Sequence, residues 1–181
     1  MISPNRSSSW PACRLILSAL IIVTTALSCG VYSFKDVSIP PQVKTIRVGF
    51  IENRSRYVDP QLSPLLTDKF KTKIASQTKL VQIQTDNADY DVTAYISDYS
   101  VSTAGVSNQA ASINRLTVTV HLALKNKLAD QKLGTPDFDT DITRIFDFPA
   151  TQTLNDAQAQ LEPTIVSQLS DDMFNRLFSN W

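Results

Sequence analysis

Few residues of this sequence have the types and the spacing that chemistry requires. His121 is the one histidine, which excludes a metal site built from several histidines. It lies on the polar side of a predicted strand, and no serine or cysteine nucleophile motif accompanies it. We therefore interpret His121 as an exposed structural histidine and expect no enzyme activity.

Aspartates form two clusters that carry enough charge to suggest a cation. They are Asp86, Asp89 and Asp91 in a predicted turn, and Asp137, Asp139 and Asp141 at a spacing of two. Aspartate is common in turns because its carboxylate bonds the backbone, and the distal glutamate of a calcium loop is missing. No partner ligand can be named for the second cluster, so we expect no metal.

A short apolar run near the start of the chain indicates export. Residues 15–27 read LILSALIIVTTAL, 13 residues with no charge, whereas a membrane span needs roughly 20. Arg6 and Arg14 lie before the run, and no acidic residue lies before it. A basic start followed by a short apolar core is typical of a secretory signal peptide, which we assign to residues 1–28.

Cys29 directly follows this signal, in the stretch ALSCG. The stretch resembles the lipobox of bacterial lipoproteins, in which the cysteine becomes the first residue and its sulfur carries a diacylglycerol. Ser28 and Gly30 fit that pattern, and Ala26 stands where leucine or valine is usual. Because Cys13 lies inside the signal, no second thiol remains for a disulfide. We expect Cys29 to be the lipid anchor, bearing diacylglycerol and an N-acyl chain; an ordinary signal with an incidental cysteine is the alternative.

The composition of the exported part fits one neutral domain. Of the 17 Lys and Arg and the 17 Asp and Glu, only Arg6 and Arg14 precede Cys29, which leaves a net charge of about −2. No overall field favours nucleic acid, and we expect no cofactor beyond the covalent lipid. Residues 29–43 contain two adjacent prolines and predict a flexible tether, and residues 44–181 predict a single domain.

Alternation and helical spacing predict the first half of that domain. Residues 45–51 alternate, with Ile46, Val48 and Phe50 on the buried side of a strand. A helix is predicted over 64–77, because apolar residues recur there every four positions. A short strand follows at 80–84.

A long hairpin and a second helix complete the prediction. Strands over 91–103 and 113–125 are joined by a loop at 104–112, and a phase change near Ser97 and Asp98 predicts a bulge. Another strand covers 140–148. The last segment, from Leu154 to about Trp181, has a helical apolar stripe including Phe174 and Phe178, which Pro163 should kink or split. This order predicts an α+β two-layer sandwich, with a mostly antiparallel sheet of about four to five strands and two helices on one face.

Five stretches together resemble the LptE family of lipopolysaccharide-assembly outer-membrane lipoproteins. They are CGVYSF (29–34), KTIRVGFIENRS (44–55), LSPLLTDKFKTKI (62–74), NRLTVTVHLALKN (114–126) and DDMFNRLFSNW (171–181). The resemblance implies a sheet with two packed helices. It also implies a lipid-anchored protein in the outer membrane, facing the periplasm, that assists assembly of an LptD-type β-barrel and plugs it.

The resemblance further implies contact with lipopolysaccharide. Phosphates are best met by clustered cations, and the candidates are Lys125, Lys127 and Lys132 after the long strand and Arg54 with Arg56 after the first strand. Ordinary solubilising charge is the alternative for both clusters. A periplasmic lipoprotein that binds a lipid or peptide without a barrel partner is the alternative function, and an anchored hydrolase is a third.

Overall fold

The structure is a computed structural model and describes residues 39–107 and 110–179. The signal peptide, Cys29 and Trp181 lie outside these residues. The elements, in chain order, are β1 (Thr45–Val48), β2 (Glu52–Asn53), α2 (Leu62–Gln77), β3 (Val81–Gln82), β4 (Tyr90–Ser107), β5 (Ala110–Asn126), the 3-10 helix η1 (Ala129–Gln131), β6 (Phe138–Pro149) and α3 (Leu154–Phe178).

The strands form one mixed sheet of six strands, in the order β3-β1-β4-β5-β6, with β2 beside β4. β4, β5 and β6 are antiparallel, whereas β1 is parallel to both β3 and β4, and β2 is parallel to β4. The predicted α+β class is confirmed. The sheet has more strands than predicted and is less uniformly antiparallel, because the crossover through α2 brings β3 parallel to β1.

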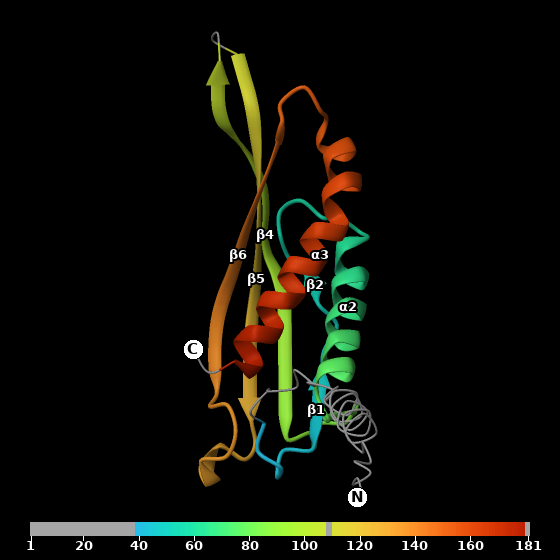
Figure 1. Cartoon of the computed structure of the whole chain (residues 1–181), viewed down its shortest axis with the longest axis vertical. Coiled ribbons are helices and arrows are strands. Elements are labelled where there is room, and N and C mark those ends of the chain that lie inside the picture. The colour runs from blue at the N-terminus through green and yellow to red at the C-terminus, as the bar shows by residue number, and fades with distance from the viewer. Residues whose placement is uncertain (1–38, 108–109, 180–181) are drawn as a thin grey trace, which may run out of the picture. The chain divides into compact units, whose positions relative to one another are not determined.

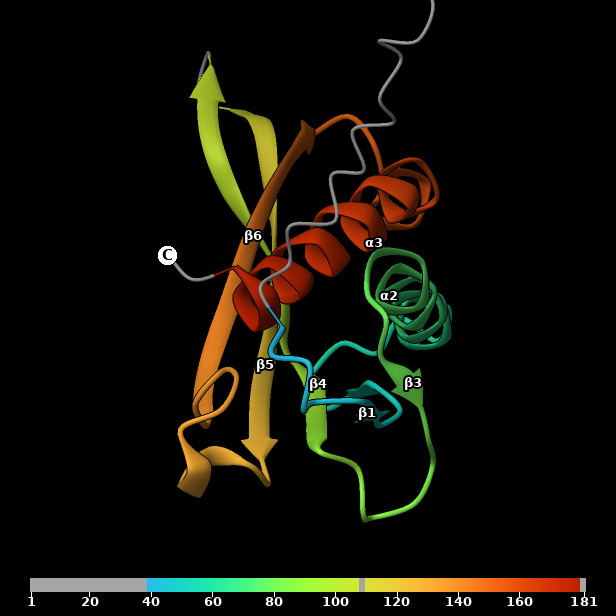
Figure 2. The same cartoon turned by 60° about the horizontal axis from the view of Figure 1, so that its bottom comes forward.

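Both helices pack on one face of the sheet, as predicted (Figures 1 and 2). Between the layers lies one apolar core, to which α2 contributes Leu62, Leu66, Phe70 and Ile74 and α3 contributes Ile165, Leu169, Met173, Phe174, Leu177 and Phe178. β5 contributes alternate residues from Leu116 to Leu124. The core also includes Val43, so the last part of the predicted tether belongs to the packed domain.

The first predicted strand is interrupted at Gly49. β1 ends at Val48, and the chain resumes pairing with β4 only at β2. The phase of burial changes across the gap: Ile51 is fully buried and Phe50 is 57% exposed. The prediction that Phe50 faces the core is therefore wrong. Ile51 takes that place, and its backbone N–H donates to Thr67 of α2 at 3.0 Å.

The hairpin is longer than predicted. β4 and β5 continue their pairing to Ser107 and Ala110, so most of the predicted loop at 104–112 is strand. The small uncharged residues of this stretch, mostly Ala, Ser and Gly, gave no alternation to reveal this extension. The predicted bulge is confirmed, since the register shifts between Ile96 and Asp98.

α3 runs unbroken through Pro163, so the helix is not split. Its first turns and its remainder point in different directions in Figure 1, a change of direction of the kind expected where proline removes a backbone hydrogen bond. Thr153 caps its start by accepting a hydrogen bond from the backbone N–H of Asp156 at 3.3 Å. Phe174 and Phe178 are core residues, as predicted.

Candidate functional site

The predicted lipid anchor, Cys29, lies outside the described residues, and its lipidation stays a prediction. Within the part of the chain that the structure describes, no helix is long and apolar enough to cross a membrane. The first described residue, Ile39, is half-buried and packs against the core. The chain therefore enters the domain beside the start of β1.

The three predicted lysines lie at the end of β5 and in the segment after it. Lys125 is the cross-strand partner of Asp91. The Lys127 ammonium donates to the carbonyl oxygen of Asp86, and Lys132 is exposed in a left-handed backbone conformation with φ 55°. Lys127 is thus held by a backbone carbonyl, and Lys125 lies across from an aspartate that binds Arg47.

Arg54 and Arg56 lie in a different place. They follow β2, which pairs with β4 at Tyr95 and Ile96, whereas the lysine segment follows Asn126, which pairs with Tyr90 at the start of β4. Because β5 runs antiparallel to β4, the two cationic clusters are separated along the sheet and do not form one site. Arg54 is also held by Glu52, at 2.9 Å between Nη2 and Oε2.

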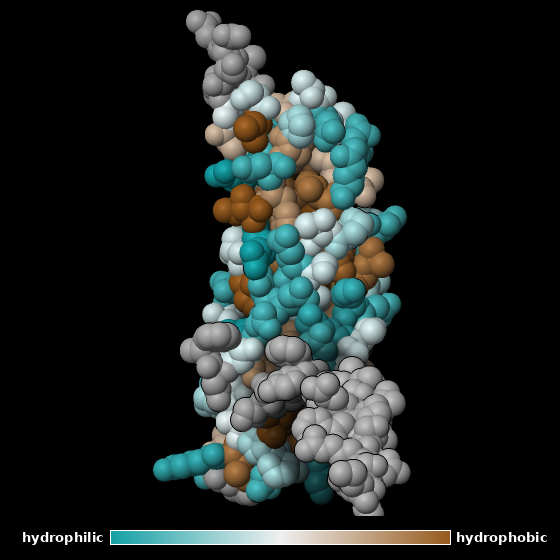
Figure 3. Space-filling model, viewed as in Figure 1, coloured by the Kyte–Doolittle hydropathy of each residue, from teal (hydrophilic) through white to brown (hydrophobic). Residues whose placement is uncertain are grey.

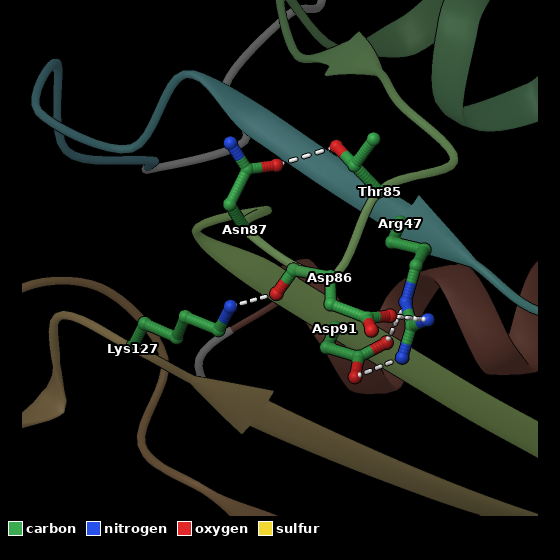
Figure 4. A network of polar contacts seen from close by, with 6 residues as sticks. All are labelled: Arg47, Thr85, Asp86, Asn87, Asp91 and Lys127. Carbon is green, nitrogen blue, oxygen red and sulfur yellow. Dashed lines mark hydrogen bonds and ion pairs between the residues drawn. The ribbon is translucent and has the colours of Figure 1, made fainter.

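The aspartates of the first cluster bind β1 from the start of β4 and from the turn before it; Figure 4 shows Asp86 and Asp91 with Arg47. Arg47 contacts Asp86 and makes a two-pronged contact with Asp91, at 2.8 Å from Nε and 2.6 Å from Nη2. The hydrogen bond with Asp91 raises the pKa of Arg47, which stays charged. Asp89 accepts from the backbone N–H groups of Lys44 and Thr45, both at 2.9 Å.

The second aspartate cluster brings His121 into a row of side chains across the sheet. His121 Nδ1 lies 2.8 Å from Asp141 Oδ1, and Nε2 lies 2.9 Å from Asp139 Oδ1. The third member, Asp137, instead accepts from the backbone N–H of Asn126 at 2.7 Å. Both ring nitrogens of His121 therefore face carboxylates. The described residues hold no group of three such side chains arranged around a common metal position.

Aromatic and cation–π contacts extend this row to β4 and to the residue after β2. The Tyr95 and His121 rings are stacked with centroids 4.7 Å apart, and the Arg54 guanidinium lies 4.3 Å from the centre of the Tyr95 ring. The row thus runs from the residue after β2 across β4 and β5 to β6. Sequence reasoning missed it, because only the strand register places Tyr95 opposite His121 and His121 opposite Asp141.

The rest of this face, opposite the helices, is mainly polar, with Ile113 and Ile145 as exposed apolar residues among paired polar ones. Arg115 binds Asp147 through two contacts of 2.8 and 2.9 Å, and the hydroxyls of Thr119 and Thr143 are 3.0 Å apart. The hydrogen bond with Arg115 lowers the pKa of Asp147. Figure 3 shows the side on which the helices lie, where apolar side chains reach the surface as separate spots among polar ones. On the opposite side, the paired polar side chains allow the uncovered sheet face to meet a polar surface.

Several solved structures are similar to this chain at low sequence identity. They include a minor lipoprotein from Acinetobacter baumannii (11% identity, TM-score 0.47, covering 75% of this chain and 90% of that one). Others are rare lipoprotein B from Shewanella oneidensis (12%, 0.45, 72% and 92%) and lipoprotein B from Nitrosomonas europaea (10%, 0.49, 76% and 80%). No curated protein sequence matches the chain.

The family follows from the sequence itself. A sequence model of LptE, described as lipopolysaccharide-assembly, matches residues 43–177, which is well over half of the chain. The match covers β1 to nearly the end of α3, so it includes both layers and the uncovered polar face. The chain belongs to the LptE family of lipopolysaccharide-assembly lipoproteins.

Proposed function

We propose that this chain is an outer-membrane lipoprotein that helps to assemble an LptD-type β-barrel and plugs it from the periplasmic side. The observation that carries this proposal is the uncovered face of the β4–β5–β6 sheet, whose polar side chains contact one another, as Arg115 with Asp147 and His121 with Asp139 and Asp141. The lumen of a large outer-membrane barrel is polar. A rigid domain with such a face can fill it while its polar side chains keep their partners.

The lipid on Cys29 is the second part of the proposal. A thioether-linked diacylglycerol with an N-acyl chain exceeds the two signals that stable anchoring requires. Anchoring would hold the domain close to its barrel and raise its effective concentration there. No catalytic step is part of this function.

Co-purification tests the proposal. The full chain with a C-terminal affinity tag is extracted from outer membranes in mild detergent, and its companions are identified by mass spectrometry. We expect a stoichiometric large β-barrel, and we expect Cys29→Ala to lose incorporation of a palmitate analogue. Recovery of the lipoprotein with soluble proteins alone would instead favour the anchored lipid- or peptide-binding function.

Lipopolysaccharide contact belongs to the same proposal and has two separate candidate clusters. We place it first at Lys125, Lys127 and Lys132, of which Lys132 is exposed to solvent. Changing these lysines to glutamate should weaken binding of purified lipopolysaccharide by the full chain. If the matched Arg54→Glu, Arg56→Glu variant weakens it instead, the arginine segment is the contact.

A further inference from the structure

One stretch of β4 has a free backbone edge. β1 pairs with β4 at Tyr90 to Val92, β2 pairs with it at Tyr95 and Ile96, and the backbone N–H of Arg54 donates to the Ile96 carbonyl at 2.9 Å. Beyond that bond, no other strand in the described residues pairs with this side of β4. Residues 98–103 keep a continuous register with β5 between two bulges, and we call them the open edge.

The open edge is accessible as well as unpaired. From Ser100 to Ala104 every residue is exposed, and Val101 is 40% exposed. Alternate residues of an antiparallel strand point their N–H and C=O groups away from the partner strand. The open edge therefore presents a row of free donors and acceptors, in the plane of the sheet, where a further strand could pair.

The other long edge of the sheet, β6, is protected in the usual ways. Its exposed residues include the charged side chains of Asp139, Asp141, Arg144 and Asp147, and it ends at Pro149. Charges and proline on an edge strand oppose unwanted pairing. The open edge has no such device after Asp98, because no charged residue and no proline occurs until Arg115.

Side chains beside the open edge define what it would accept. On the helix side, Tyr57 stacks on Tyr99 with ring centroids 5.5 Å apart, and Tyr57 and Val58 are 40% and 58% exposed. Val101 follows Tyr99 on the same side of the strand. The opposite side carries the hydroxyls of Ser100 and Ser102. An incoming segment would thus be extended and uncharged, with apolar residues toward the helices and polar residues on the other side.

We propose that the open edge binds an extended segment of the barrel partner as an added β-strand. The added strand would pair with β4 beyond Ile96, where the pairing with β2 has ended at Asn53. This inference rests on the proposed function and specifies how the partner is held. Main-chain hydrogen bonds supply affinity in this mode of recognition, and the alternating side chains supply specificity. A phosphorylated glycolipid is a poorer fit, because the stretch between Asp98 and Arg115 contains no cation.

A matched pair of lysine substitutions tests the proposal in the full-length, membrane-extracted protein. Val101→Lys places a charge beside the open edge, and Val81→Lys places one on the edge strand β3, outside the β4–β5–β6 face, where Val81 is 60% exposed. We expect Val101→Lys to lower the amount of co-purified barrel on the order of tenfold, the equivalent of one or two lost hydrogen bonds. Val81→Lys should leave it unchanged. Circular dichroism checks that both variants fold.

Hydrogen exchange of the wild-type complex supplies an independent measurement. Amides in residues 98–103 should exchange more slowly in the barrel complex than in the isolated lipoprotein. If the barrel co-purifies equally with both variants and these amides are not slowed, the strand-addition proposal is overturned and the proposed function stands. If no barrel co-purifies with the wild type, the proposed function itself fails. Slowed exchange that appears with concentration in the isolated lipoprotein would identify a second copy as the occupant and also overturn the proposal.

Discussion

The two ends of the β4–β5 hairpin are built in opposite ways. At the end beside β1, Tyr90 is fully buried, its hydroxyl accepts from the backbone N–H of Thr135 at 2.7 Å, and the Thr135 hydroxyl donates to the Leu177 carbonyl at 2.9 Å. At the far end, Ser100 to Ala104 are exposed and pair only with β5. We call the first region the locked end and the second the free end.

The locked end should therefore contribute mainly to the stability of the fold, whereas the free end is available for binding. The locked end joins segments that are far apart in the sequence, since the backbone N–H groups of Lys44 and Thr45 donate to the Asp89 carboxylate at 2.9 Å. Such bonds form only when the whole fold forms, so they contribute to its cooperativity. At the free end, Ser100 to Thr103 pair on one side only, with β5 residues that pair in turn with β6. Their side chains are exposed, so they bury less apolar surface than residues of the locked end. Substitutions in the two regions should therefore have very different effects on unfolding.

The largest effect is expected in the core beneath α3. Leu169 is fully buried between the layers, and Leu169→Ala should lower the free energy of unfolding by about 2–5 kcal/mol. The matched change at the free end, Val101→Ala, removes a side chain that is 40% exposed and should cost less than about 1 kcal/mol. Urea unfolding followed by circular dichroism measures both. Equal midpoints for the two variants would show that α3 does not cover the sheet as described.

An intermediate effect is expected at Asp89 of the locked end. Asp89→Asn weakens the hydrogen bonds from Lys44 and Thr45 and should cost about 1–3 kcal/mol at pH 7. Partial burial acts to raise the pKa of Asp89, but these bonds outweigh it and hold the pKa below its usual value.

The pH dependence of that effect has a definite sign. Because the pKa of Asp89 is lower in the folded state, its stabilisation is present above the unfolded-state value of about 4 and is lost as the pH falls through the folded value. The stability difference between wild type and Asp89→Asn should therefore shrink below about pH 4. A difference that stays constant down to pH 2 would mean that the carboxylate charge is not what Asp89 contributes.

The locked end also shows what sequence reasoning can and cannot supply. Alternation identified the buried residues of β5, and four-residue spacing identified α2, since both patterns follow from the geometry of a single element. The partner strands could not be identified in the same way. Asp86 and Asp91 were interpreted as turn residues, and only the parallel pairing of β1 with β4 shows that both bind Arg47.

The candidate site was less predictable than the fold for the same reason. His121, Asp139 and Asp141 were each noted, but as separate features, because 18 or more residues separate the histidine from the aspartates. Their meeting depends on the β5–β6 register. The open edge was even harder to predict from the sequence, since a free edge is recognised by the absence of a neighbouring strand. Its one sequence signal was the long uncharged stretch before Arg115.

The smallest effect is expected at Tyr99, where the free end begins. The side chain is 2% exposed, and its hydroxyl is buried with no hydrogen-bond partner among the described residues. A buried hydroxyl without a partner contributes a desolvation cost, so Tyr99→Phe should change the free energy of unfolding at pH 7 by less than about 1 kcal/mol, or raise it. The ring keeps its stacking with Tyr57.

Alkaline pH makes this small effect measurable. Burial raises the pKa of Tyr99 to about 12, whereas an unfolded tyrosine ionises near pH 10. The unfolded state therefore releases this proton first, and wild-type stability should decline between about pH 10 and 12. Tyr99→Phe should reduce that decline, because it removes the hydroxyl whose pKa is raised. If Tyr99→Phe instead lowers the free energy of unfolding by more than about 2 kcal/mol at pH 7, the Tyr99 hydroxyl has a hydrogen-bond partner. Tyr99 would then belong with the tightly bonded part of β4, and the free end would begin after it.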